Sequence, residues 1–202
     1  ENGKMTWWYD NGVKKSVGEM EEGKLTGKFI EWHEKKKKKT ETEFKDNIQN
    51  GKITNWDKFG VKKSESEYKD GKLNGKLIEY YFNGTNRFET EFKDGLKNGV
   101  SKGWNDKGVI NKFEEYKDGN LNGKRTVWWD EGKILCEENY KDGKKNGKFV
   151  KWFENGNKES ECEYKDDKLN GKYNVWHENG SKESESEFKE GNTDLTKKIC
   201  DI

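Results

Sequence analysis

The sequence predicts an all-β protein, an elongated single-layer antiparallel β-meander built of about eight 24-residue β-hairpin repeats. Glycines and large aromatic residues recur together every 24 residues, and a fixed period of this length is the signature of a repeat array. Side chains alternate along the stretches between the glycines, as they do in strands. The chain contains no proline, which suits a sheet in which every backbone N–H is needed for the ladder.

The stretch YKDGKLNGK at residues 68–76 shows the frame of the repeat. We number each repeat from the residue that precedes its KDG-like sequence, which is position 0. Position 0 is occupied in turn by Met20, Phe44, Tyr68, Phe92, Tyr116, Tyr140, Tyr164 and Phe188. Glycines follow at positions +3, +7 and +16, and these three columns hold 21 of the 23 glycines. Glycine therefore punctuates the repeat and is not a linker residue.

Each repeat is predicted to contain two strands and two reversals. One representative pair of strands spans residues 76–82 and 85–92, joined by Asn83 and Gly84. An Asn-Gly pair favours a type I′ turn, in which both central residues need φ > 0. A second, longer reversal is expected over residues 94–99. Helix is disfavoured because glycine recurs every few residues.

Strand alternation also predicts two different faces. We expect the large aromatic residue at position +12 to share a face with Thr6, Thr54 and Thr126, and with Ser64, Ser66 and Tyr68 of the return strand. The opposite face is expected to carry the glutamates of the return strands, such as Glu65 and Glu67, beside a mixed column of Phe29, Ile53, Leu77, Phe149 and Tyr173.

The composition fits such a ribbon better than an ordinary core. Only 28% of residues are hydrophobic and 40% are charged, a balance that by itself would suggest disorder. The strict register of tryptophan and glycine overrules that interpretation, and stability must come from ladder hydrogen bonds and cross-strand aromatic pairs. The array is predicted over residues 1–192, with a truncated first repeat. Residues 193–202 are predicted to form a C-terminal capping strand, because Leu195 and Cys200 stand where glycine and tryptophan are due.

Several classes of function are disfavoured. The net charge of +1, from 41 basic and 40 acidic residues, argues against a nucleic-acid partner. Three cysteines at irregular places are interpreted as free thiols, and no apolar run is long enough to span a membrane. His33 and His177 occupy the same position six repeats apart, so they cannot share a metal ion. No catalytic constellation is present, and we expect no enzyme activity, no cofactor and no metal.

Two sets of residues are candidates for binding. The first is the aromatic column at position +12: Trp8, Trp32, Trp56, Tyr80, Trp104, Trp128, Trp152 and Trp176. Such a column can stack ligands, but one ring per hairpin is first a requirement of the architecture. The second is a run of five lysines, Lys35, Lys36, Lys37, Lys38 and Lys39, which is either a patch for an anionic partner or a solvated loop.

The recurring phrase resembles the bacterial variant of the MORN repeat. It is carried most clearly by GKFVKWFENGNKESECEYKDDKLNG at residues 147–171 and GKLIEYYFNGTNRFETEFKDGLKNG at residues 75–99, and the resemblance extends over residues 1–192. The resemblance implies a single-layer ribbon of hairpins used for binding. MORN-type proteins are associated with protein–protein contacts, dimerisation and phospholipid head groups, and the bacterial variant is described as antitoxin-like or as part of secreted and surface proteins.

We therefore expect a non-catalytic repeat scaffold that binds another protein through one face of the β-ribbon. One alternative is a peripheral membrane or phospholipid-binding module that uses residues 35–39 and exposed aromatic side chains. Another is an antitoxin that neutralises a partner toxin. The open ends of the ribbon also allow self-association. For location, the resemblance favours a secreted or cell-surface protein of a bacterium over a cytoplasmic one.

Overall fold

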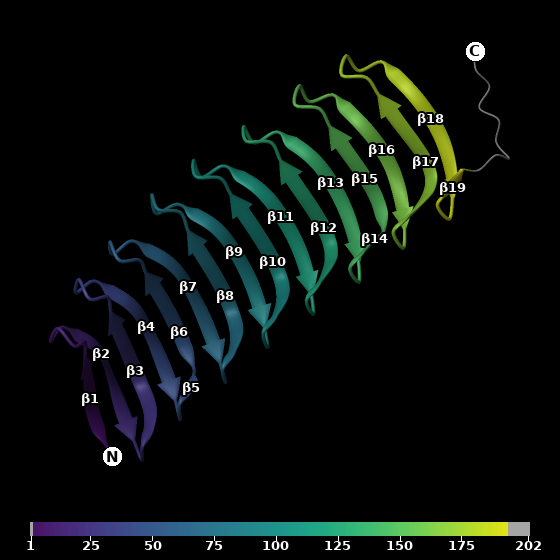
Figure 1. Cartoon of the computed structure of the whole chain (residues 1–202). Helices are drawn as coiled ribbons and strands as arrows, with labels where there is room; N and C mark the ends of the chain where they lie inside the picture. Colours follow the sequence, from purple (N-terminus) through teal and green to yellow (C-terminus); the bar gives the residue numbers. More distant parts are fainter. Residues whose placement is uncertain (1, 194–202) are drawn as a thin grey trace, which may run out of the picture. The chain divides into compact units, whose positions relative to one another are not determined.

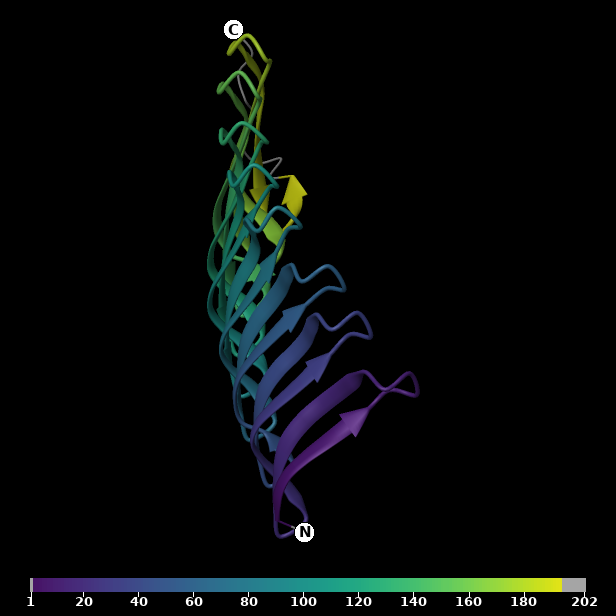
Figure 2. The ribbon, with the colours of Figure 1, turned by 90° about the vertical axis from the view of Figure 1, so that its left-hand side faces the viewer.

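The computed structural model describes residues 2–193 and confirms an all-β, antiparallel meander of hairpin repeats. The chain divides into two compact halves, which we call the N-terminal half (Glu1–Asn98 with Asp106–Gly108) and the C-terminal half (Gly99–Asn105 with Val109–Ile202). Within each half the strands follow one another in chain order (Figure 1). Each half is one layer of curved strands, and no second layer covers it in the described part of the chain (Figure 2). None of the described residues forms a helix that is long and apolar enough to cross a bilayer.

The N-terminal half contains β1 (Gly3–Trp8), β2 (Lys14–Glu21), β3 (Lys24–Trp32), β4 (Lys38–Lys45), β5 (Ile48–Gln49), β6 (Gly51–Trp56), β7 (Lys62–Lys69), β8 (Lys72–Tyr80) and β9 (Asn86–Lys93). The boundary between the halves falls within β10 (Leu96–Trp104). The C-terminal half continues with β11 (Ile110–Lys117), β12 (Asn120–Trp128), β13 (Ile134–Lys141), β14 (Lys144–Lys145), β15 (Gly147–Trp152), β16 (Lys158–Lys165), β17 (Lys168–Trp176), β18 (Lys182–Lys189) and β19 (Asn192–Thr193). Of the predicted capping strand, residues 194–202 lie outside the described part of the chain.

The reversal at the Asp-Gly sequence is a tight two-residue turn and not the longer reversal that we predicted. In the hairpin of β7 and β8, Lys69 pairs with Lys72, and the two residues between them, Asp70 and Gly71, have φ of 49° and 76°. Two consecutive positive φ values are the mark of a type I′ turn. Aspartate tolerates this left-handed conformation better than most residues. The strand that follows therefore begins at Lys72, four residues earlier than predicted.

The reversal at the Asn-Gly sequence is a three-residue turn, so the predicted type I′ turn at Asn83 and Gly84 is wrong. The N–H of Gly84 donates to the carbonyl of Tyr81 (2.9 Å), and only Gly84 has a positive φ, of 84°. This is a type I turn closed by a left-handed glycine. The asparagine has another role: its Oδ1 accepts from the N–H of Thr85 (3.0 Å), and its Nδ2 donates to the carbonyl of Asp106 in the next turn (2.7 Å).

Most of the glycines at position +7 lie beside a glutamate of the preceding strand and make room for it. Gly75, with φ of 117°, is an example: a Cβ at this position would lie 3.0 Å from the Cβ of Glu67. The strand pairing shifts at the same place, between Ser66 and Tyr68. Position +7 is therefore a β-bulge and does not bound a loop.

The register reverses our assignment of the faces. Ile53 pairs with Ser66 and Thr54 pairs with Glu65, and directly paired residues of antiparallel strands point to the same side. The aromatic column at position +12 therefore lies on the face of the glutamates. We call this side of the sheet the tryptophan face. It carries positions +8, +10 and +12 of the outgoing strands and the glutamates at positions −1 and −3 of the return strands. The other side, which we call the seam face, carries positions 0, −2 and −4 with +9 and +11.

Position −2 is the most buried row of the seam face. In the N-terminal half it contains Thr42, Ser66 and Thr90, and in the C-terminal half it contains Glu114, Glu138 and Cys162, all of them buried. On the tryptophan face the corresponding buried row is position +10, with Thr54, Thr126 and Val150. Each face thus has a narrow buried strip and no deep core, which agrees with the scarcity of aliphatic residues.

Neighbouring repeats are joined by backbone hydrogen bonds at the two-residue turns. The N–H of Gly71 donates to the carbonyl of Gln49 (2.9 Å), which is position +5 of the preceding repeat. Asn47 replaces glycine at position +3 and keeps the positive φ that we expected, 66°. Its side chain adds a second bond, because Oδ1 accepts from the N–H of Leu25 (2.6 Å). Asp167 in the C-terminal half makes the same contact with the N–H of Lys145 (2.7 Å).

Candidate functional site

The predicted aromatic column stands at the end of each outgoing strand on the tryptophan face. Trp8 is 59% exposed, and the other seven rings are partly buried. Lysines of the return strands cover several of these rings. The Nζ of Lys14 lies 5.8 Å from the ring centroid of Trp8 and 5.7 Å from that of Trp32, and Lys62 lies 5.6 Å from that of Tyr80. The column is therefore occupied to a large extent by packing and cation–π contacts within the chain.

The glutamates of the tryptophan face are paired with lysines at position +8. Examples are Lys52 with Glu65 (3.4 Å) and Lys124 with Glu137 (2.6 Å). A second lysine, Lys62, lies 2.7 Å from Glu65, and its hydrogen bond is the main reason that the pKa of Glu65 lies below its ordinary value. Much of the charge on this face is thus neutralised within the chain.

The run of five lysines is divided by the strand that it enters. Lys36 takes the place of the turn glycine with φ of 62°. Lys38 lies 2.7 Å from Glu41 and Lys39 lies 2.9 Å from Glu31, and the bond to Glu31 raises the pKa of Lys39. Of these five lysines, the three of the turn, residues 35–37, are exposed and form no ion pair with another described residue.

Two neighbouring three-residue turns of the N-terminal half present exposed aromatic rings. Phe59 is 64% exposed and Phe82 is 73% exposed, and their ring centroids are 6.4 Å apart. The Nζ of Lys58 lies 5.2 Å from the ring of Phe59. The turn of Lys35, Lys36 and Lys37 immediately precedes these two in the array.

An open groove of 660 Å³ lies where the seam face of the N-terminal half meets these turns. We call it the Asn55 groove. Its lining includes His33, Lys39, Thr40, Asn55, Lys58, Phe59, Lys63 and Ser64. On its floor, Thr40 Oγ1 donates to Asn55 Oδ1 (3.1 Å), and Asn55 Nδ2 donates to Ser64 Oγ (3.1 Å).

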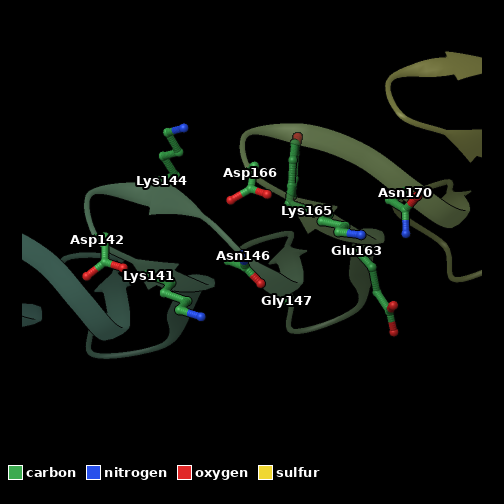
Figure 3. Close-up of a pocket in the computed structure, with 10 residues that line it drawn as sticks. Lys141, Asp142, Lys144, Asn146, Gly147, Glu163, Lys165, Asp166 and Asn170 are labelled. Carbon is green, nitrogen blue, oxygen red and sulfur yellow. The ribbon is translucent and has the colours of Figure 1, made fainter.

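A second open groove, of 680 Å³, lies at the Asp-Gly turns of the C-terminal half (Figure 3). Its lysines, Lys141, Lys144 and Lys165, are matched by Asp142, Asp166 and Glu163. The labelled side chains point in different directions and do not converge on one point. This balance of charge gives the groove no preference for a cation or an anion.

The comparisons with known proteins agree with the geometry of the repeat. The family model described as the MORN repeat variant matches residues 1–22, 121–142, 145–166 and 169–190. The starts of these segments differ by multiples of 24 residues, so all four fall in one frame. The chain carries MORN repeats of this variant. A comparison with curated protein sequences finds no match.

Two repeats of the C-terminal half depart from the common pattern in a way that the sequence analysis missed. Arg125 at position +9 lies between two buried carboxylates: its Nε is 3.2 Å from Glu114, and its Nη1 donates to Glu138. Lys112 lies 2.9 Å from Glu114, and Lys145 lies 2.9 Å from Glu138. These five residues form a charged chain along the seam face. We call them the Arg125 chain.

The Arg125 chain changes the acidity of its members. Burial raises the pKa of Glu114, but hydrogen bonds from Lys112, Tyr116 and Arg125 outweigh it and leave the pKa below its ordinary value. The pKa of Glu138 is lowered in the same way, by Lys145 and Arg125 against burial. Burial, followed by the bond to Glu114, raises the pKa of Tyr116 to about 12.

A signal for this chain was present in the sequence. The other repeats have an apolar or aromatic residue at position +9, with Ser101 as the exception, whereas Arg125 is one of only two arginines in the protein. Glutamate replaces serine or threonine at position −2 in the two flanking return strands. The error was to place positions +9 and −2 on opposite faces, which concealed that these charges meet.

Each histidine has its own contact within its half of the chain. His33 Nε2 lies 3.1 Å from the carbonyl of Trp56, and His177 Nδ1 lies 3.9 Å from Glu183. Among the described residues, no group of three or more His, Cys, Asp or Glu side chains is arranged to hold a metal ion. Of the cysteines in the described part, Cys162 is buried and Cys136 is half-buried, and burial raises the pKa of both thiols.

Proposed function

We propose that the protein is a non-catalytic repeat scaffold that binds another protein across its seam face. The observation that carries this proposal is the aromatic row at position 0 of that face in each half, with Phe44, Tyr68 and Phe92 in the N-terminal half and Tyr116, Tyr140 and Tyr164 in the C-terminal half. These rings are partly exposed beside the position +9 side chains, with contacts such as Phe29–Phe44 at 5.8 Å. Tyrosine and phenylalanine are enriched in the centres of protein interfaces. The tryptophan face, in contrast, engages many of its lysines and glutamates in its own ion pairs.

A photocrosslinking experiment tests which face is used. A photoreactive amino acid would replace Tyr68 on the seam face in one variant and Lys52 on the tryptophan face in the other. Both variants would be expressed in the cells that make the protein. We expect a crosslinked heteromeric product from the Tyr68 variant alone. Products of equal yield from both positions, or none from either, would contradict the proposal.

A second candidate function, membrane attachment, is supported by a different observation. Phe59 and Phe82 are exposed on adjacent turns and follow the exposed lysines 35–37. Aromatic side chains beside lysines suit an anionic lipid surface. The attachment would involve the turn edge of the N-terminal half and would leave the seam face accessible.

Sedimentation with vesicles that contain phosphatidylserine tests this second function. Replacing lysines 35–37 by serine should abolish most of the binding, and Phe59→Ala with Phe82→Ala should weaken it further. A control variant removes three exposed lysines elsewhere, Lys141, Lys144 and Lys168. Equal loss with the control would show that only the net charge matters, and absence of binding by the unchanged protein would end the idea.

A further inference from the structure

We infer that the Asn55 groove binds an acidic peptide segment of a partner protein. The inference rests on the proposed scaffold function and specifies the partner's chemistry. Some features of the chain recur in nearly every repeat, and others occur only once. The aromatic rows and the turns recur in nearly every repeat and cannot mark one place in the array, whereas the lining of this groove occurs once.

The floor of the groove is built to donate hydrogen bonds. Thr40 pairs with Asn55, and Asn55 pairs with Ser64, so the three side chains stand side by side on β4, β6 and β7. The bonds run in one direction, from Thr40 to Asn55 and from Asn55 to Ser64. Because Ser64 Oγ accepts from the amide, its own hydrogen can be donated outward. Asn55 is the only asparagine at position +11 in the array.

The walls of the groove are positively charged. Lys39, Lys58 and Lys63 line it, and neither Lys58 nor Lys63 has an ion-pair partner among residues 2–193. The carboxylate of Asp57, which also lines the groove, is directed into its own turn, where Oδ1 accepts from the N–H groups of Phe59 (2.8 Å) and Val61 (2.9 Å). The charge of Lys63 still acts on Asp57 and helps to lower its pKa. The groove nevertheless has more lysines than carboxylates in its lining, together with an outward donor.

The equivalent places in the last repeats of the C-terminal half have the opposite charge. Lys39 and Lys63 stand at position −5, where Glu159 and Glu183 stand later in the chain. The ion pair beside the groove is inverted as well: position +11 is Glu31 against Lys39 in the N-terminal half, and Lys151 against Glu159 (2.7 Å) in the C-terminal half. An anionic ligand would thus distinguish the two ends of the array.

The exposed ring of Phe59 adds an apolar contact to the groove. A small anion would not use this ring, and a membrane surface would reach the turns but not the floor between the strands. An extended peptide can place carboxylates at Lys58 and Lys63 and an apolar side chain against Phe59. The open shape of the groove also suits an extended peptide that continues beyond the groove at both ends.

Fluorescence anisotropy tests the inference with a labelled peptide of glutamates around a single phenylalanine. The double charge reversal Lys58→Glu with Lys63→Glu should weaken binding by about tenfold or more. The matched control reverses two exposed lysines at the opposite turn edge of the same half, Lys69→Glu with Lys93→Glu. It should change the affinity by no more than about twofold, because distant surface charges are screened.

A third variant, Asn55→Asp, keeps the size of the side chain but turns the floor from donor to acceptor. It should also weaken binding, and its thermal unfolding should match that of the unchanged protein. Equal effects of the two double reversals, or no binding by the unchanged protein, would overturn the inference. The inference would also be overturned if the unchanged protein self-associated and the Lys58 and Lys63 reversal abolished that self-association. The groove would then be occupied by a second copy of the chain. If the peptide fails to bind while Tyr68 still crosslinks to a partner, the scaffold function stands and only the groove is wrong.

Discussion

The buried row of the seam face differs between the two halves of the chain. In the N-terminal half, position −2 contains threonine and serine beside apolar neighbours such as Ile53 and Leu77. In the C-terminal half, Glu114 and Glu138 occupy the same position and enclose Arg125. The strand pairing is nevertheless the same in both, with one bulge per hairpin. The glycines and turns therefore specify the backbone, and the seam can change from neutral to charged if neighbouring positions change together.

The largest expected effect comes from breaking the Arg125 chain at its centre. Arg125→Leu leaves two buried carboxylates without their shared partner, and loss of one member of a buried ion pair costs about 3–5 kcal/mol. Urea unfolding would measure the loss. Arg87→Leu is the matched control, because Arg87 is the other arginine and is exposed. A loss at Arg125 no larger than that at Arg87 would show that the charged seam is not more fragile than its surroundings.

Converting the charged seam into the neutral one should reverse most of that loss. The triple variant Glu114→Thr, Arg125→Leu and Glu138→Thr copies the N-terminal pattern into the C-terminal half. We expect its unfolding free energy to equal that of the unchanged protein or to exceed it by about 1–4 kcal/mol, because an ion-pair cluster is often no better than an apolar replacement. If the triple variant remains as unstable as Arg125→Leu, the two seams are not interchangeable.

The charged seam also predicts a dependence on pH that the neutral seam lacks. The pKa values of Glu114 and Glu138 are lowered on folding. Such groups stabilise the fold above their ordinary pKa of 4.5, and this contribution is lost as the pH falls through their lower folded-state values. We therefore measure the unfolding free energy from about pH 6 down to about pH 3. It should fall more steeply with decreasing pH in the unchanged protein than in the triple variant. Parallel curves would contradict the assignment.

The smallest expected effect lies where the two halves are alike, at Asn47 and Asp167. Asn47→Gly removes one hydrogen bond, worth about 1 kcal/mol, but relieves a left-handed conformation that costs a similar amount. The melting temperature should barely change. Asn47→Ala loses the bond and keeps the strain, so its melting temperature should fall clearly. Equal results for the two variants would show that the side-chain bond contributes nothing.

The sequence was sufficient to predict the period, the hairpins and the single layer, because glycine positions and tryptophan spacing record them directly. It misassigned the turns because Asn-Gly and Asp-Gly both suit a type I′ turn, and only hydrogen bonding separates them. Asn83 uses its side chain to hold Thr85 and Asp106, so it does not need the left-handed conformation that Asp70 adopts. The turn edges thus depend on contacts between repeats, which strand alternation within one repeat does not reveal.

One candidate surface was predicted from the sequence and two were missed, for a related reason. The aromatic column was visible because it recurs, but the glutamates that lie on the same face were assigned to the opposite side, and the lysines that cover the rings were not assigned to a face. The Asn55 groove and the Arg125 chain were missed because each depends on residues from several strands that occur once. Thr40, Asn55 and Ser64, for example, become a group only when Thr40 is known to face Asn55. Residues that depart from the repeat can be assigned to a common cluster only when the strand register is known.

The bond from each turn amide to position +5 of the repeat before it has a consequence for how such a chain can change in length. A repeat such as the one that contains Gly71 and Leu73 carries both the donor for its predecessor and the acceptor for its successor, as the bond from Gly95 to Leu73 shows (2.8 Å). Duplication or loss of a whole 24-residue block therefore joins a donor to an acceptor that already fits. An insertion of any other length would separate the two. The gene can therefore gain or lose whole repeats while the same backbone hydrogen bond joins each pair of neighbouring repeats.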